Sequence, residues 1–260
     1  MTFQLTVLGG SAAWPNPGQG CSAYLLDVDG TRLLLDCGTD TLLELRRHIP
    51  LADVDAIIIS HCHSDHILDL IAYRYALVYS KEQPEAPIPI WMPPGGAAIL
   101  EALGKTLGSQ GEKTTDFWGD VFRVREYDPD GHLSIDGSTI TFAPTQHFTE
   151  CYAMRVRGAS GKSVLYGADT GRIDSLIEFS RSANLLIAEA TADSHDGIPK
   201  EERGHLIPEE AGEWAARATV GRLLLTHLWH ERPPSLVVER AATKFHGLID
   251  VACAGLTLYV

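Results

Sequence analysis

The chain has 260 residues, of which 45% are hydrophobic and 21% are charged, and its formal net charge at pH 7 is -13. This composition is typical of a globular protein and excludes a disordered or low-complexity chain. The negative charge disfavours long nucleic acids as partners, because most of the surface repels a phosphate backbone.

The sequence gives no sign of a membrane segment or of a disulfide framework. No run approaches the roughly 18 uninterrupted apolar residues that a membrane helix needs, and residues 3–8 alternate like a strand instead of forming a signal peptide. The five cysteines are scattered and include no CxxC pair, which indicates reduced thiols. We therefore expect a cytoplasmic protein without a membrane partner.

The first third of the chain alternates short apolar runs with turn residues, and then shows helical periodicity. Asp29-Gly30 between two apolar runs is a hairpin signal. The predicted strands are 3–8, 22–28, 32–35 and 56–59, and the predicted helices are 41–48, 66–79 and 95–107.

A Pro- and Gly-rich stretch over 81–119 predicts an irregular connector near a cleft, and its segment 84–96 is a candidate lid. Beyond it, strands are predicted at 121–127, 139–143, 152–156, 164–166, 185–188, 223–226 and 256–260, and helices at 173–180, 208–219 and 236–245. No polar boundary divides the chain. One domain over 1–260, with two packed sheets flanked by helices, fits this alternation.

Three imidazoles and a carboxylate follow the apolar run 56–59 within six residues: His61, His63, Asp65 and His66. A lone histidine at such a place is usually a solvated turn residue, but this density predicts a metal site. Neutral imidazole and carboxylate suit zinc and other divalent ions. The spacing indicates that the first two histidines bind one ion, while the last two residues turn toward a second.

Two metal sites of about four to six ligands each need further donors. Metal-competent residues follow three later apolar strands: His147, Asp169 and His227. We expect them to complete a centre of two divalent ions, with zinc as the first choice and manganese or iron as alternatives.

These residues resemble the metal ligands of the metallo-β-lactamase superfamily, whose HxHxDH motif matches 61–66 and whose later ligands match in order. The resemblance implies an α/β fold, the four-layer αββα sandwich of two mixed sheets flanked by helices. It implies that His61, His63 and His147 hold one metal, that Asp65, His66 and His227 hold the other, and that Asp169 bridges them. Asp36 resembles the family's acid that supports the ligand loop, or is a turn residue.

Two adjacent dications polarise an electrophile and hold a bridging hydroxide near neutral pH, so we expect hydrolysis with Asp65 among the catalytic residues. Glu189, within 186–191, is similar to the acid of the Glu-Ala-Thr segment of tRNase Z-like phosphodiesterases. His205, before the helix 208–219, is similar to their extra histidine. The likeness implies that His205 protonates the leaving oxygen or contacts the phosphate and that Glu189 orients it. Otherwise they are a surface histidine and a strand-end acid.

Only 21 residues separate His147 from Asp169, which leaves no room for the long tRNA-binding arm of those enzymes. The layout looks closest to a compact bacterial branch that includes atypical cyclic-nucleotide phosphodiesterases. We therefore expect a small phosphodiester substrate such as a cyclic nucleotide, hydrolysed by a metal-bound hydroxide, and a possible homodimer by the same likeness.

Two alternatives stay open. A lactonase or β-lactamase-type ring hydrolase would use the same metal pair, with 88–96 as a hydrophobic lid for an acyl chain. A noncatalytic metal-dependent binding or sensor module would keep the ligands without turnover. Phe148 and Trp229, beside two predicted ligands, either stack on a base or ring or serve packing.

Overall fold

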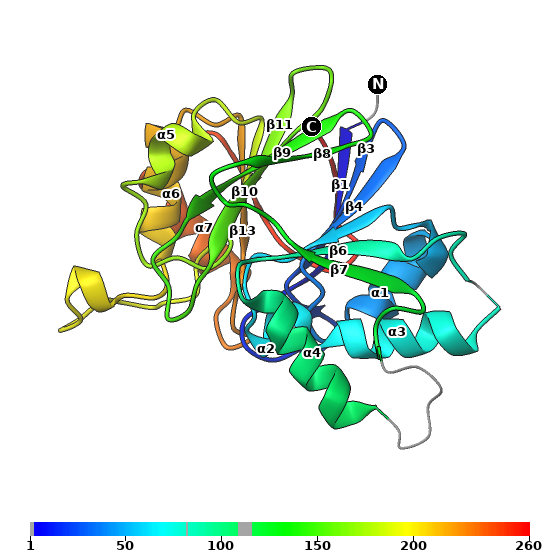
Figure 1. Cartoon of the computed structure of the whole chain (residues 1–260). Helices are drawn as coiled ribbons and strands as arrows, with labels where there is room; N and C mark the ends of the chain where they lie inside the picture. Colours follow the sequence, from blue (N-terminus) through cyan, green and yellow to red (C-terminus); the bar gives the residue numbers. More distant parts are fainter. Residues whose placement is uncertain (1–2, 82, 109–115) are drawn as a thin grey trace.

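Two mixed β-sheets lie face to face in a computed structural model that describes residues 3–81, 83–108 and 116–260 (Figure 1). Helices α1, α3 and α4 pack on the outer face of the first sheet, and α5, α6 and α7 on the outer face of the second. The four-layer αββα arrangement predicted from the sequence is therefore confirmed.

The first sheet has the order β15-β1-β3-β4-β5-β6-β7, and β2 pairs with β1. Its strands are β1 (Phe3–Ser11), β2 (Gly20–Cys21), β3 (Ala23–Val28), β4 (Thr31–Leu35), β5 (Ala56–Ile58), β6 (Ile88–Met92), β7 (Phe122–Glu126) and β15 (Thr257–Tyr259). The predicted hairpin at Asp29-Gly30 joins the antiparallel pair β3 and β4, and both residues have positive φ as such a turn requires. From β4 to β7 the strands run parallel.

The second sheet has the order β14-β13-β12-β11-β10-β9-β8. Its strands are β8 (His132–Ile135), β9 (Ser138–Pro144), β10 (Tyr152–Arg157), β11 (Ser163–Tyr166), β12 (Leu185–Glu189), β13 (Arg222–Thr226) and β14 (Leu248–Val251). Strands β11 to β14 are parallel. Because parallel strands end at the same edge, the loops after them gather their side chains there.

The helices connect the parallel strands. They are α1 (Thr41–His48), α2 (Ser64–Ile67), α3 (Asp69–Tyr79), α4 (Gly96–Leu107), α5 (Leu176–Ser180), α6 (Pro208–Arg217) and α7 (Pro234–Ala242), with short 3-10 turns at Leu51–Asp53 and Lys200–Glu202. The helix predicted over 66–79 is divided at Leu68. There the amide of Asp69 donates to the carbonyl of Cys37 and not to the preceding helical turn, so a tertiary contact breaks the helix.

The prediction of an irregular connector over 81–119 is wrong at residues 88–92, whereas the helix predicted within it at 95–107 is confirmed. Residues 88–92 form β6, inside the first sheet, and are therefore no lid; 96–107 form α4. Pro89 argues against a strand in the sequence, because proline lacks the amide hydrogen that a central strand donates to its neighbour. Its position is tolerated here because β5 pairs with β6 only from Ile90 onward. Residues 82 and 109–115 of the connector lie outside the described part of the chain.

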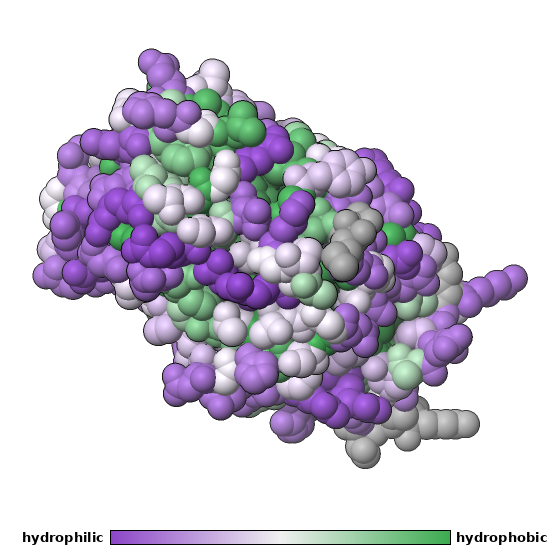
Figure 2. All heavy atoms as spheres, turned by 90° about the horizontal axis from the view of Figure 1, so that it is seen from above, coloured by the Kyte–Doolittle hydropathy of each residue, from purple (hydrophilic) through white to green (hydrophobic). Residues whose placement is uncertain are grey.

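Figure 2 shows the end of the molecule opposite α2, with hydrophilic residues spread over it and smaller hydrophobic areas between them. In the described ranges, no helix is both long and apolar enough to cross a membrane.

The interface between the sheets is closed by aromatic side chains. Tyr127, which follows β7, stacks on Phe142 of β9 with ring centroids 3.8 Å apart. Tyr24 of β3 meets Tyr166 of β11 at 5.0 Å. All four rings are buried. These contacts hold the two sheets together near the edge where the loops gather.

We expect Phe142→Ala to lower the free energy of unfolding by about 3–5 kcal/mol, because it removes one ring of the stack and leaves a cavity. Leu43→Ala is the control: this α1 side chain is 68% exposed, so its loss should change stability by no more than about 0.5 kcal/mol. Urea unfolding followed by circular dichroism measures both. Equal losses in the two variants would contradict the prediction.

Candidate metal centre

The structure brings all seven predicted ligands to one edge of the sandwich. They follow β5, β9, β11 and β13 or lie in α2. One group contains His61, His63, His147 and Asp169, and the other contains Asp65, His66 and His227, with the candidate ligand atoms of each group within 4.8 Å of one another. The two clusters are consistent with a binuclear metal site.

Asp169 faces both groups. Its Oδ2 lies 3.6 Å from His147 Nε2 and 3.5 Å from His227 Nε2. Its Oδ1 lies 3.6 Å from His66 Nε2. A carboxylate in contact with ligands of both groups occupies the position that a bridging ligand needs.

Unpaired buried atoms show that the centre suits a cation. Among the described residues, His61 Nε2, His66 Nε2 and Asp169 Oδ1 are buried without a hydrogen-bond partner. A buried polar atom left in this state costs about 1–3 kcal/mol. Because imidazole nitrogen and carboxylate oxygen are metal ligands, divalent ions placed among them would satisfy all three atoms.

A buried carboxylate orients the ligand loop. Asp36 Oδ2 accepts hydrogen bonds at 2.7 Å from His66 Nδ1, Ser60 Oγ and Tyr166 OH, and Oδ1 accepts one at 2.7 Å from the Ser60 amide. The bond to Nδ1 leaves His66 Nε2 free to face the centre, as metal ligation requires. Asp36 also has a positive φ of 58°, so both readings of the sequence, supporting acid and turn residue, describe it.

Other ligands are held in the same manner. His147 Nδ1 donates to the carbonyl of Gly204 at 2.9 Å, and His227 Nδ1 donates to Thr191 Oγ1 at 2.8 Å. The amide of Ala13 donates to Asp65 Oδ2 at 2.8 Å. Ala13 and Thr191 cannot be recognised from the sequence, because a backbone amide and a hydroxyl distant in the chain leave no ligand-like pattern.

Burial and charge set the protonation of the ligands. Burial, together with the neighbouring histidines, holds the pKa of His61 well below its usual value, and burial also lowers the pKa of His63 and His147. Burial raises the pKa of Asp169, but the charges of His227 and His66 outweigh this effect and hold it well below its ordinary value. His61, His63 and His147 thus favour the neutral form that binds metals, and Asp169 favours the ionised form. Burial lowers the pKa of His66, but the charges and hydrogen bonds of Asp169 and Asp36 outweigh it and raise this pKa well above its usual value, so a metal ion would have to displace a proton there.

Glu189 and His205 lie together beside the ligands. Glu189, at the end of β12, is 1% exposed, and its Oε1 accepts hydrogen bonds from His205 Nδ1 at 2.9 Å and from the Thr170 amide at 2.8 Å. The His205 ring stacks on His227, with centroids 5.5 Å apart. Burial lowers the pKa of His205, but the charge and hydrogen bond of Glu189 outweigh it and raise the pKa to about 9.

Left-handed backbone geometry gathers at this centre. Among the described residues, nine non-glycine residues have positive φ, and four of them lie at this centre: Ala13, Asp36, Ala168 and His227. Such conformations cost free energy and persist only where the surroundings enforce them, which is common at functional sites. They turn the chain sharply after a strand and point the ligands inward.

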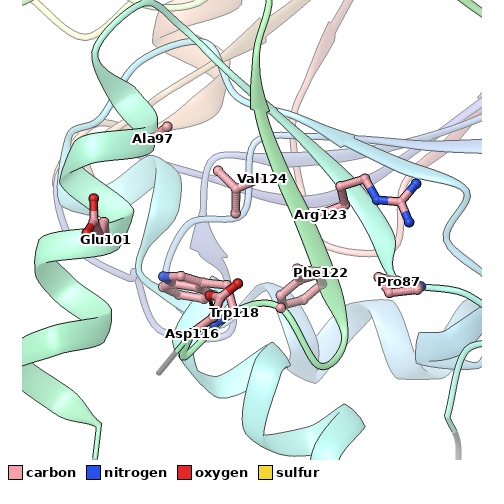
Figure 3. Close-up of a pocket in the computed structure, with 9 residues that line it drawn as sticks. Pro87, Ala97, Glu101, Asp116, Trp118, Phe122, Arg123 and Val124 are labelled. Atoms are coloured by element: carbon pink, nitrogen blue, oxygen red, sulfur yellow. Dashed lines mark hydrogen bonds between the residues drawn. The ribbon is translucent and has the colours of Figure 1, made fainter. Parts of the chain in front are cut away.

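A separate hollow of about 380 Å³ lies between α4 and β7 (Figure 3). Its described lining includes Glu101, Asp116, Trp118 and Arg123 but no histidine or cysteine. The metal-competent side chains converge elsewhere, so the edge of the sandwich is the candidate functional site.

We expect Asp36→Asn to lower zinc affinity by about 10–100-fold, because it removes the charge that orients His66 and places an amide against groups that donate. Asp53→Asn is the control, since Asp53 pairs with Arg32 at the surface, far from the ligands in the fold. Competition with a chromophoric chelator measures both affinities. Unchanged affinity in Asp36→Asn would rule out the orienting role.

Comparison with known proteins agrees with this geometry. "Probable metallo-hydrolase YhfI" of Bacillus subtilis is 34% identical over 257 residues, covering 97% of this chain and 98% of the relative. Its crystal structure matches with a TM-score of 0.86 at 31% identity and covers 100% of both chains. Ribonuclease Z of Mycobacterium bovis is 29% identical over 269 residues, covering 96% of this chain and 95% of the relative.

A likeness at lower identity extends the fold relationship. The crystal structure of the short form of human tRNase Z has a TM-score of 0.74 at 23% identity and covers 98% of both chains. The Beta-lactamase superfamily domain matches residues 31–228, which include every candidate ligand. This match over most of the length, with the 34% identity to YhfI, shows that the chain belongs to the metallo-β-lactamase superfamily.

Proposed function

We propose that this protein is a metal-dependent phosphodiesterase that hydrolyses small phosphodiesters, with a cyclic nucleotide as the leading substrate and zinc as the metal. The observation that carries the proposal is the hydrogen-bonded pair of His205 and Glu189 beside the metal centre. Hydrolysis of a phosphodiester expels an alkoxide, which needs a proton. His205, oriented by Glu189, would donate this proton.

The pair holds His205 in one orientation. Its Nδ1 donates to Glu189, so Nε2 is the nitrogen left for the substrate. The His205 side chain is 25% exposed, whereas those of His61 and His66 are completely buried. It therefore touches the space that a substrate enters. Glu189 cannot swing away, because the amides of Thr170 and Thr191 also bond to it.

Two divalent ions held by the seven ligands would polarise the phosphoryl group and activate water at neutral pH. Protonated His205 then gives its Nε2 proton to the leaving oxygen as the P–O bond breaks. The neutral ring keeps its Nδ1 proton toward Glu189, which stabilises the correct tautomer. The amide of Ala13 donates a hydrogen bond to Asp65 Oδ2, which lies 3.1 Å from His227 Nε2. Asp65 would therefore contribute to catalysis as a metal ligand.

The loops around the centre favour a small substrate. Between His147 and Asp169 the chain forms only β10, β11 and short turns, so this region carries no arm for a long RNA. The net charge of -13 favours the same conclusion. The likeness to ribonuclease Z supports phosphodiester chemistry, and these features favour a compact substrate.

The ring-hydrolase alternative has lost the feature that favoured it. Its acyl-chain lid was expected over 88–96, but 88–92 is the interior strand β6. A lid for an acyl chain therefore has no support in this segment. Only an activity assay distinguishes a noncatalytic metal-dependent module from the proposed enzyme, since such a module would show no turnover.

We expect His205→Ala to lower kcat for cyclic AMP by about 100-fold, because the alkoxide then leaves without a proton. The loss should be much smaller with bis(p-nitrophenyl) phosphate, whose phenolate leaves readily unprotonated. His132→Ala on the edge strand β8 is the control, and zinc content is measured in every variant. An equal loss on both substrates would contradict the role of His205 as an acid.

We expect zinc-loaded protein to hydrolyse phosphodiesters faster than a lactone or a β-lactam, since the segment expected to form a lid over an acyl chain is strand β6 of the first sheet. Each substrate is assayed at matched concentration, before and after removal of metal with a chelator and after its restoration. Turnover of the ring substrates alone would overturn the phosphodiesterase proposal, and no turnover of any substrate would favour the binding module.

A further inference from the structure

Two tryptophan rings stand in solvent near the metal centre. Trp14 and Trp229 meet edge to face, with ring centroids 5.0 Å apart and an interplanar angle of 60°. They are 47% and 41% exposed, whereas Trp118 and Trp214 are buried in the core. In an edge-to-face pair, one ring covers only one face of the other, so ring surface stays open to a ligand.

Hydrogen bonds fix this pair relative to the ligands. Trp14 follows Ala13, whose amide donates to Asp65 Oδ2 at 2.8 Å. Trp229 lies two residues after His227. The pair is thus attached on both sides to ligands of one metal group.

The two loops that carry the tryptophans are also joined to each other through Leu228. Its amide donates to the carbonyl of Gly10 at 2.9 Å. Its carbonyl accepts from Asn16 Nδ2 at 2.9 Å and from the amide of Ala12 at 3.3 Å. The rings are therefore exposed on a backbone that is held in place, which is the condition for a preformed binding surface.

We propose that Trp14 and Trp229 form a stacking site for the nucleobase of the substrate. The inference rests on the proposed phosphodiesterase function and names its substrate class: nucleoside phosphodiesters in preference to alkyl ones. A nucleotide combines an anionic phosphate with a flat ring, and this edge of the protein combines a cation centre with flat, exposed aromatic faces. Stacking on aromatic rings accepts any base and gives substantial affinity.

The first test holds the scissile bond and leaving group constant. The substrates are the p-nitrophenyl ester of thymidine 5′-monophosphate and methyl p-nitrophenyl phosphate, which differ only in the group that remains on phosphorus. We expect the variant Trp14→Ala/Trp229→Ala to lower kcat/KM for the nucleoside substrate by about tenfold or more, and to change that for the methyl substrate by less than about twofold.

Matched variants separate stacking from folding. Trp14→Phe/Trp229→Phe keeps flat rings and should retain most of the preference for the nucleoside substrate. Tyr259→Ala removes a 74% exposed ring on β15, in a different part of the fold, and should retain all of it. Zinc content and melting temperature are measured for each variant. Equal losses on both substrates, or no loss on either, would overturn the stacking site.

The second test does not depend on turnover. Calorimetry compares the binding of adenosine 5′-monophosphate and ribose 5-phosphate to zinc-loaded protein, since both carry the same phosphate. We expect the adenosine compound to bind about tenfold more tightly, with this difference lost in Trp14→Ala/Trp229→Ala. A preference without phosphodiester turnover would support the stacking site while the proposed reaction fails; turnover without a preference would overturn the stacking site alone.

Discussion

The carboxylate of Asp36 connects the two sheets to the ligand loop. It lies at the end of β4 in the first sheet, binds Ser60 in the loop after β5 and His66 in α2, and accepts a hydrogen bond from the hydroxyl of Tyr166 in the second sheet. A carboxyl group so deeply buried is tolerated only when hydrogen bonds replace those it would make with water. Four donors supply these hydrogen bonds to Asp36. Together they link the two sheets and orient the ring of His66.

Around this carboxylate, the centre is assembled almost entirely from strand ends. A strand inside a sheet is hydrogen-bonded to a neighbour on each side, so the residues that directly follow it are held in fixed positions. The helices between the parallel strands return the chain to the opposite end of each sheet. Close backbone packing adds to this accuracy. A Cβ at Gly38 would collide with the carbonyl of Asp65, so only glycine lets the loop after β4 approach α2 so closely.

The parts that the sequence could predict were those encoded locally. The density of histidines at 61–66 and the apolar runs before His147, Asp169 and His227 are visible without the fold, and the sheet layers and the grouping of all seven side chains agree with them. The features that the sequence could not predict depend on contacts between residues far apart in the chain. The break before Asp69 comes from Cys37, Pro89 fits because of the register of β5, and Ala13 acts through its backbone alone. Glu189 and His205 were paired by family likeness, since nothing local joins residues on separate segments.

The spread of the ligands along the chain bears on how the protein acquires its metals. The first ligands lie at 61–66, but His147, Asp169 and His227 come from the second sheet, and the last follows β13. During synthesis, the early histidines emerge long before their partners and present only half of a coordination shell. The first group lacks His147 and Asp169 until β9 and β11 are in place, and the second lacks His227 until β13 has joined its sheet, so the pair of sites is complete only once the second sheet has formed through β13. A chain truncated before β13 therefore has the early ligands without the complete pair of sites.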